Sequence, residues 1–256
     1  MRKRLALACA LAAAGAAQAY LGQVITWFNS PSHYPAALAI SADYLYVYHS
    51  DYVFDIYRVD AETGSVYGSF ANPFNGYTRG LGYEYGGYLW IAWCEYPDAA
   101  MYRVNHMTGS IYSSFPVTEH MLYAGCDCQG DPTQPGTLAA VVSASYSTLV
   151  ATRHTPAGSL LNSFVTVNAL GDPAWDYGNN LIWFPQWAAK TVYGYNTAGS
   201  LVASFPAPAT YTRGACYRDG YLWLCSQETN RIYKVHCPNI IGVEPASFGT
   251  VKALFR

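Results

Sequence analysis

The chain has little charge, and beyond its first 19 residues it has no long apolar run. Only 12% of the residues are charged and no basic stripe occurs, so nucleic acid is not an expected partner. Without a second long apolar run, no membrane span is expected in the rest of the chain. The sequence G-x-S-x-G is absent, and the six histidines are scattered with no acidic residue at a telling spacing. Nothing in the sequence therefore indicates an acyl-transfer triad.

The first 19 residues are typical of a secretory signal peptide. Arg2, Lys3 and Arg4 precede an Ala-rich run that ends in Ala17-Gln18-Ala19, an A-x-A cleavage site. The alternative is an N-terminal membrane anchor, but the run is short for a spanning helix. Cleavage before Tyr20 leaves 11 basic residues against 16 acidic ones. We therefore expect a secreted protein, located outside the cell or at the cell surface.

Six cysteines follow this leader, and an even number in an exported chain favours disulfide bonds. The disulfide candidates are Cys94, Cys126, Cys128, Cys216, Cys225 and Cys237. Free buried thiols and a metal site are the alternatives, but Cys126-x-Cys128 lacks the usual metal-ligand spacing and no histidine lies close by. We expect no cofactor or metal, although carboxylates from different repeats could gather around Ca²⁺ in a central channel.

Five copies of one pattern organise the chain. Each copy ends in a Gly-to-Phe segment: GQVITWF (22–28), GSVYGSF (64–70), GSIYSSF (109–115), GSLLNSF (158–164) and GSLVASF (199–205). The final phenylalanines are 42, 45, 49 and 41 residues apart. Each unit reads as four short strands rich in Tyr, Trp, Val and Ile, cut by Gly, Asp and Asn turns. Four-stranded units of this length are typical of a β-propeller, with a solenoid or a sandwich as the alternatives.

The last unit lacks a Gly-to-Phe segment of its own and stops near Cys237-Pro238. The segment 22–28 is therefore predicted to be its missing fourth strand, and closing the ring in this way removes an open sheet edge. The predicted fold is all-β: a five-bladed β-propeller of four-stranded blades, closed by an N-terminal strand that completes the last blade. The predicted domains are a signal peptide (1–19), the propeller (20–238) and a C-terminal tail (239–256).

Two sets of turn residues recur within the units. Asp219-Gly220 and Asn179-Asn180 suit tight hairpins with positive φ. Asp60, Asn105, Asn196 and His236 share one repeat position, where they are expected to make Asx-type turn bonds. The third unit departs from the pattern with CDCQGDPTQPG (126–136), which reads as a tolerated surface loop or as a functional insertion.

The run YTRGLGYEYGGYLW (77–90), followed by MYRVNHMTGSIYSSF (101–115), resembles secreted repeat propellers over nearly all of 20–237. Among five-bladed members the chain is similar to the plant and bacterial glutaminyl cyclases, whose hallmark is F-T-Q-G-L-E. The matching run is Tyr77-Thr78-Arg79-Gly80-Leu81-Gly82, in which Arg79 replaces the Gln and Gly82 replaces the acidic residue implied in catalysis. Because glycine cannot serve as a general acid or base, the resemblance implies the fold more than the activity.

In such a propeller the first strand of each blade lines the channel, and ligands commonly bind on the face that bears the loops before those strands. The candidate ligand-binding residues at the channel mouth are His33, Tyr77, Arg79, His120, Asp172, Tyr211 and Arg213. Arg79 and Arg213 hold equivalent positions and could bind a carboxylate or phosphate together. The alternative is that each arginine caps carbonyl groups or pairs with a neighbouring acid.

The C-terminal tail is not needed for closure. Its end, TVKALFR, alternates as a strand does, although a short helix is not excluded. It resembles short terminal segments of some secreted bacterial repeat proteins, which implies sorting or attachment. The tail residues expected to make contacts are Phe248, Val251, Ala253 and Phe255. A strand-like tail could add to a blade edge of another copy and build a fibre.

The sequence as a whole favours a non-catalytic structural or binding protein. We expect a homo-oligomer or fibre formed through the tail and a Tyr-rich surface, with other surface proteins or glycans as further partners. The alternative is a secreted propeller enzyme, of glutaminyl-cyclase, lactonase or lyase type, with its site at the channel mouth.

Overall fold

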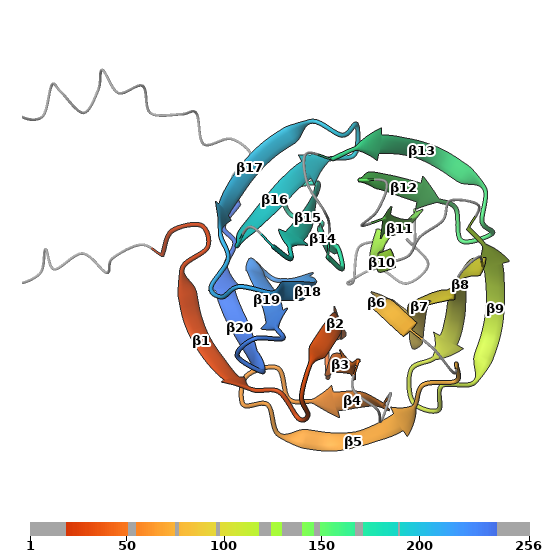
Figure 1. The fold of residues 1–256 in the computed structure, drawn as a ribbon, viewed down its shortest axis with the longest axis horizontal. Helices are drawn as coiled ribbons and strands as arrows, with labels where there is room; N and C mark the ends of the chain where they lie inside the picture. Colours follow the sequence, from red (N-terminus) through yellow and green to blue (C-terminus); the bar gives the residue numbers. More distant parts are fainter. Residues whose placement is uncertain are drawn as a thin grey trace, which may run out of the picture.

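A computed structural model describes residues 19–50, 55–74, 77–95, 98–117, 124–129, 140–145, 149–166, 171–188 and 190–239. These residues form small antiparallel sheets in a propeller arrangement (Figure 1). Each of the five sheets has four strands, and we number the sheets along the chain. No helix among the described residues is long and apolar enough to cross a membrane.

The strand bounds are as follows. Sheet one contains β2 (Pro35–Ile40), β3 (Leu45–His49), β4 (Asp55–Val59) and β5 (Val66–Ala71). Sheet two contains β6 (Tyr77–Glu84), β7 (Tyr88–Glu95), β8 (Asp98–Asn105) and β9 (Ile111–Pro116). Sheet three contains β10 (Ala124–Gln129), β11 (Ala140–Ser145), β12 (Val150–His154) and β13 (Leu160–Val165). Sheet four contains β14 (Ala174–Asp176), β15 (Leu181–Gln186), β16 (Thr191–Asn196) and β17 (Leu201–Pro206). Sheet five contains β18 (Thr212–Arg218), β19 (Tyr221–Ser226), β20 (Arg231–His236) and β1 (Val24–Asn29).

The N-terminal strand β1 is the fourth strand of the last sheet. It pairs antiparallel with β20, and Trp27 lies opposite Tyr233. The innermost strands β2, β6, β10, β14 and β18 contact one another in that order, and β18 contacts β2 (Figure 1). The pairing of β1 with β20 is the contact that the Gly-to-Phe pattern predicts for segment 22–28.

A repeated Gly–Phe contact explains why the pattern recurs. The glycine that opens each outer strand lies against the phenylalanine that ends the preceding one. The pairs are Phe28 with Gly64, Phe70 with Gly109, Phe115 with Gly158, Phe164 with Gly199, and Phe205 with Gly22. At Gly64 (φ +74°) an added Cβ would lie within van der Waals overlap of the Phe28 ring, at 2.8 Å from Cγ. The same contact therefore joins every neighbouring pair of sheets, including the two pairs that involve β1.

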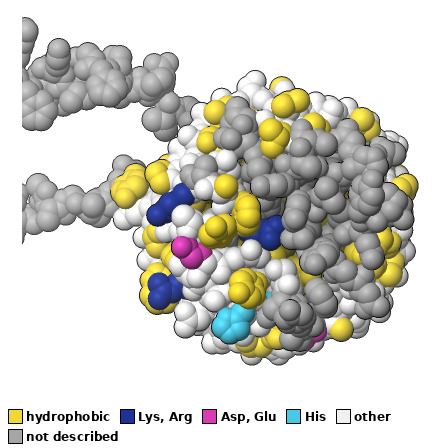
Figure 2. Space-filling view, viewed as in Figure 1, with side chains coloured by type: hydrophobic (Ala, Val, Ile, Leu, Met, Phe, Trp, Pro, Cys, Tyr) yellow, Lys and Arg dark blue, Asp and Glu magenta, His cyan; other side chains and the backbone are white. Residues whose placement is uncertain are grey.

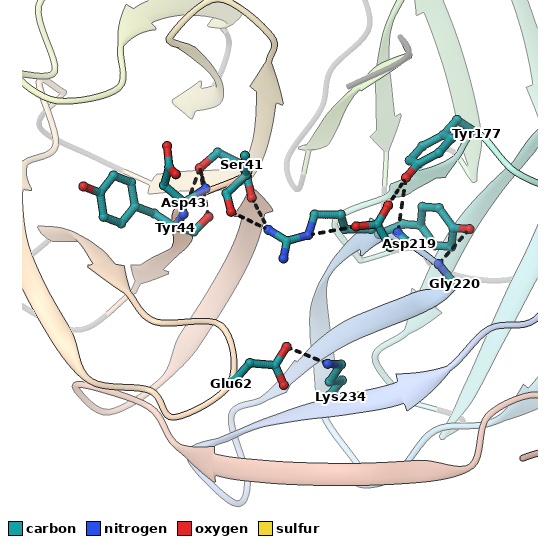
Figure 3. Close-up of polar contacts among 11 residues, drawn as sticks. Ser41, Asp43, Tyr44, Glu62, Tyr177, Asp219, Gly220 and Lys234 are labelled. Atoms are coloured by element: carbon teal, nitrogen blue, oxygen red, sulfur yellow. Dashed lines mark hydrogen bonds and ion pairs between the residues drawn. The ribbon is translucent and has the colours of Figure 1, made fainter. Parts of the chain in front are cut away.

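The junction between sheets five and one carries additional polar contacts (Figure 3). The Arg218 guanidinium donates to the carbonyl oxygens of Ser41 and Ala42 at 2.6 and 2.9 Å. Lys234 Nζ lies 2.6 Å from Glu62 Oε1. The indole of Trp223 donates to the Ala61 carbonyl at 2.9 Å. Hydrogen bonds and an ion pair therefore join the first and last sheets of the chain.

Local predictions about turns agree with the structure except at His236, whose buried Nδ1 has no hydrogen-bond partner among the described residues. Asn180, Asp219 and Gly220 have positive φ, as the hairpin sequences predict. Asp60 accepts hydrogen bonds from the amides of Glu62 and Thr63, and Asn105 and Asn196 do the same in their turns. Every residue of the second strands β3 and β15 is buried, as expected for sheets packed on both faces.

The disulfide prediction is wrong for four of the six candidates. Cys128, Cys216, Cys225 and Cys237 are buried free thiols. They pack as small apolar side chains within the hydrophobic clusters between sheets. Cys216 and Cys225 lie in the same cluster, but they are not opposite each other in the sheet. Cys225 lies opposite Gly214, and Cys216 lies opposite Trp223. The side chains of Cys94 and Cys126 lie outside those that the structure describes.

Candidate functional site

The centre of the ring is lined by the free edges of five first strands (Figure 1). A strand edge presents backbone N–H groups that need partners when they are buried. Two aspartates, Asp127 and Asp172, supply such partners across the ring. They make this central layer the candidate functional site.

Asp172 connects three sheets. It lies just before β14, and its side chain is 2% exposed. Its amide donates to the Arg213 carbonyl of β18 at 2.7 Å. Its Oδ2 accepts from the amide of Leu38 on β2 at 3.0 Å. The residue predicted as a channel-mouth ligand thus binds backbone in sheets five and one.

Asp127 makes the corresponding connection between sheets three and four. Its Oδ1 accepts from the amide of Cys128 at 2.7 Å, and its Oδ2 accepts from the amide of Trp175 on β14 at 2.5 Å. Burial raises the pKa of the Asp127 carboxyl to about 7, although both amides act to lower it. This carboxyl therefore changes charge near neutral pH.

Strand register places Asp127 at the same position as Gly82 of the cyclase-like motif. Five first-strand residues lie opposite the same second-strand position: Ala39, Gly82, Asp127, Ala174 and Cys216. In four sheets the residue opposite is Tyr46, Trp90, Trp183 or Trp223. The acidic residue missing from sheet two is thus present in the neighbouring sheet. Asp127 is not evident from a motif comparison within one unit, but an alignment of all five units at this position singles it out.

Gly82 itself has no room for a side chain. A Cβ there would lie 2.7 Å from Asp127 Cα and 3.0 Å from the Cys128 amide nitrogen. Both are backbone atoms of β10, so a larger residue requires β10 to move. The glycine is therefore a packing requirement between sheets two and three.

Cys216, the member of this layer in sheet five, is a poor nucleophile in this setting. Burial raises the pKa of its thiol well above the ordinary value, and the charges of Asp127 and Asp172 raise it further. Burial likewise raises the pKa of Cys225 to about 12. Thiolate is the reactive form of cysteine, so neither side chain is suited to covalent catalysis at neutral pH.

Two predicted channel-mouth residues of sheet five share one aromatic neighbour. The Tyr211 ring lies 5.1 Å from that of Trp187, and Tyr211 is 45% exposed with φ +51°. The Arg213 guanidinium lies 5.8 Å from the Trp187 ring centre, and its Nη1 donates to Gln227 Oε1 at 3.4 Å. This cluster contains an exposed aromatic ring beside a cation.

His33 lies apart from this cluster among the described contacts. It is exposed, and its Nδ1 is 3.3 Å from Asn230 Nδ2. The side chains of Tyr77 and Arg79, all of His120, and Phe248, Val251, Ala253 and Phe255 of the tail lie outside what the structure describes. The proposed pairing of Arg79 with Arg213 is therefore still a prediction.

Among the described residues, no group of three or more His, Cys, Asp or Glu side chains is arranged to hold a metal ion. The face shown in Figure 2 carries hydrophobic side chains with few charged ones between them. In the central layer, the carboxylates of Asp127 and Asp172 accept hydrogen bonds from backbone amides, and the Asp127 carboxyl changes charge near neutral pH.

Comparisons with known proteins identify the architecture. A solved glutaminyl cyclase from Myxococcus xanthus superposes with a TM-score of 0.67 at 12% identity, over 84% of this chain and 95% of that one. The fold is a β-propeller. A β-propeller domain from Myceliophteria thermophila gives a TM-score of 0.51 at 11% identity, over 83% and 98% of the two chains. A virginiamycin B lyase from Staphylococcus aureus gives 0.50 at 14% identity, over 82% and 68%.

No protein-family profile and no curated protein sequence matches this chain. Because these identities are low, the likeness to the solved propellers extends to the fold alone.

Proposed function

We propose that this protein is an exported, five-bladed propeller that acts as a non-catalytic structural or binding protein at or outside the cell surface. In this proposal the N-terminal strand closes the ring, residues 1–19 direct export, and the chain associates with further copies through its C-terminal tail and Tyr-rich surface. Other surface proteins and glycans are the additional partners to examine.

The position of Gly82 carries the non-catalytic part of the proposal. An acidic side chain at this motif position would overlap the backbone of β10. The carboxylate that does occur in this layer, Asp127, accepts two backbone hydrogen bonds. Its Oδ2 therefore joins the first strands β10 and β14, and each of its oxygens accepts from a backbone amide.

The composition of the exposed surface supports the binding role. Several tyrosines are strongly exposed, among them Tyr34 at 56%, Tyr67 at 60% and Tyr112 at 65%. Exposed aromatic and aliphatic side chains are characteristic of contact surfaces, because they gain most from removal from water. With 12% charged residues, the chain has little charge to keep copies apart.

The test compares the chain from Tyr20 to Arg256 with a version that ends at Asn239. Sedimentation velocity over a range of concentrations, with electron microscopy of the same samples, measures assembly. We expect the longer chain to form oligomers or fibres and the shorter one to lose them. A longer chain that stays monomeric throughout refutes the self-association part of the proposal.

One observation favours a second candidate function, a propeller enzyme with its site at the channel mouth. A carboxyl with a pKa of about 7 is suited to general acid–base catalysis, and Asp127 occupies the register position of the missing motif residue. A solved neighbour is a glutaminyl cyclase. The test is cyclisation of a peptide with N-terminal glutamine by the wild type and by Asp127→Asn. Turnover that disappears in the variant establishes the enzyme, and equal absence in both supports the non-catalytic role.

A further inference from the structure

The outer strands form an uncharged rim around the ring. These strands are β1, β5, β9, β13 and β17, and none contains Lys, Arg, Asp or Glu (Figure 1). Each begins with two large apolar side chains, and all ten of these are at least 40% exposed. Outer strands usually carry charges that prevent edge-to-edge association, and this rim lacks them.

In sheets five and two, an arginine side chain lies over an aromatic residue of the rim. The Arg231 guanidinium lies 3.6 Å from the Trp27 ring centre of β1, and that of Arg103 lies 4.8 Å from the Tyr112 ring centre of β9. On β5, Tyr67 donates to Asp60. Together with the bond from the Arg153 guanidinium to Asn162 Oδ1 of β13 at 2.9 Å, these contacts give four of the five outer strands a charged neighbour.

The rim of sheets three and four differs in that its exposed large hydrophobic side chains are all aliphatic, with no exposed Trp or Tyr among them. Its outer strands β13 and β17 display five aliphatic side chains: Leu160 (60% exposed), Leu161 (47%), Val165 (72%), Leu201 (48%) and Val202 (51%). β17 follows β13 around the rim: Asn162 of β13 donates to the Thr197 carbonyl just before β17, and Phe164 near the end of β13 lies against Gly199. The five side chains are therefore spread along two successive rim strands. We call these five residues the aliphatic rim patch.

The size of the patch favours a second copy of the chain as its occupant. Five aliphatic side chains at these exposures leave on the order of 500 Å² of apolar surface, the upper range for a monomer. Two such patches facing each other bury about 1,000 Å², the minimum for a specific interface. The five side chains carry no charge, and the nearby Arg153 guanidinium is already hydrogen-bonded to Asn162, so two identical patches can meet about a twofold axis without bringing unpaired charges of the patch residues together.

We propose that two copies of this protein pair through their aliphatic rim patches. This inference rests on the self-association in the proposed function and names a surface for it. The contact is isologous, so each copy supplies the same residues and the pair closes as a dimer. The C-terminal tail remains available to link such dimers.

The experiment uses two double variants of the chain from Tyr20 to Arg256. Leu160→Lys with Leu201→Lys places charges in the patch. Val66→Lys with Ile111→Lys is the matched control, because these residues hold the same repeat position on β5 and β9 and are 53% and 52% exposed. Circular dichroism verifies that both variants fold, and sedimentation equilibrium gives the dimer dissociation constant.

The patch variant is expected to raise the dissociation constant at least about ten-fold, while the control stays near wild type. Equal effects of the two variants, or no effect of either, overturn the inference. If only the chain ending at Asn239 loses assembly, the tail-based proposal stands and the rim dimer is wrong. If the wild type is monomeric, both fail. If tail removal strengthens pairing that the patch variant abolishes, the tail competes for the same patch and the inference stands.

Discussion

The raised pKa of Asp127 predicts how the stability of the ring depends on pH. The folded protein holds this proton until about pH 7, whereas an unfolded chain releases it near pH 3.8. Folding is therefore favoured most by this residue below pH 3.8, and the benefit disappears as pH rises through 7. A shift of about three units corresponds to about 4 kcal/mol. Because the unfolded chain has already released most of this proton by pH 5, about 2–3 kcal/mol of this effect falls between pH 5 and 8.

The perturbation is Asp127→Asn, which removes the titration and preserves the size of the side chain. The asparagine can accept from only one of the two amides of Cys128 and Trp175, so a constant loss of about 1 kcal/mol is expected at every pH. Urea denaturation followed by tryptophan fluorescence between pH 5 and 8 gives the free energy of unfolding. The wild type should lose about 2–3 kcal/mol more than the variant across this range.

The comparison cancels every titrating group that the two proteins share. Asp43→Asn is the matched control, because it makes the same substitution at an exposed aspartate. It should follow the wild-type pH dependence. Parallel curves for the wild type and Asp127→Asn would refute the reasoning, as would a wild type that gains stability relative to the variant as pH rises.

Three further predictions concern the contacts that hold the sheets together. Gly199→Ala should lower the free energy of unfolding by about 2–4 kcal/mol in urea denaturation, because the added Cβ would lie 2.4 Å from Phe164 Cβ at φ +87°. The control Gly86→Ala, with φ +111° and open space around it, should lower it by only about 1 kcal/mol. Deleting residues 20–29 should yield aggregated protein in light scattering, since β20 becomes an exposed edge; a soluble monomer would contradict this role for β1. Glu84→Gln should lower the free energy of unfolding by about 3 kcal/mol, because Glu84 is paired with Arg103 and Trp90 in a mostly buried site. Glu62→Gln, at the exposed pair with Lys234, should lower it by less than about 1 kcal/mol. Equal losses in the two variants would refute this reasoning.

The repeat allowed much of the architecture to be predicted because its key residues meet the same requirement in every unit. Gly64 and Gly109 need positive φ in their turns, and Asp60 and Asn105 bond to amides two and three residues ahead. Such contacts leave a periodic signature in a single sequence. The absence of the final Gly-to-Phe segment was informative for the same reason, since a four-stranded unit with three strands has to obtain the fourth elsewhere.

The candidate site was predictable only in part, because its residues are brought together by contacts between sheets. Asp172 was selected as a loop residue facing the channel, but its bond to Leu38 spans 134 positions of the chain. Asp127 gave no motif signal, since its neighbours in space are Gly82 and Trp175. The disulfide prediction failed because it depended on cysteine count and export, whereas the four described thiols are accommodated as core side chains.

The Asp127 carboxylate has a structural role in the central layer. The central layer of Ala39, Gly82, Asp127, Ala174 and Cys216 consists of small residues apart from the aspartate, which allows neighbouring first strands to approach closely. At that separation Asp127 reaches the Trp175 amide of the next sheet. A substrate that displaced this hydrogen bond would leave the Trp175 amide without a partner, at a cost of about 1–3 kcal/mol. One oxygen of Asp127 is therefore engaged in joining β10 to β14, and this contact is the observation on which the proposed non-catalytic role depends.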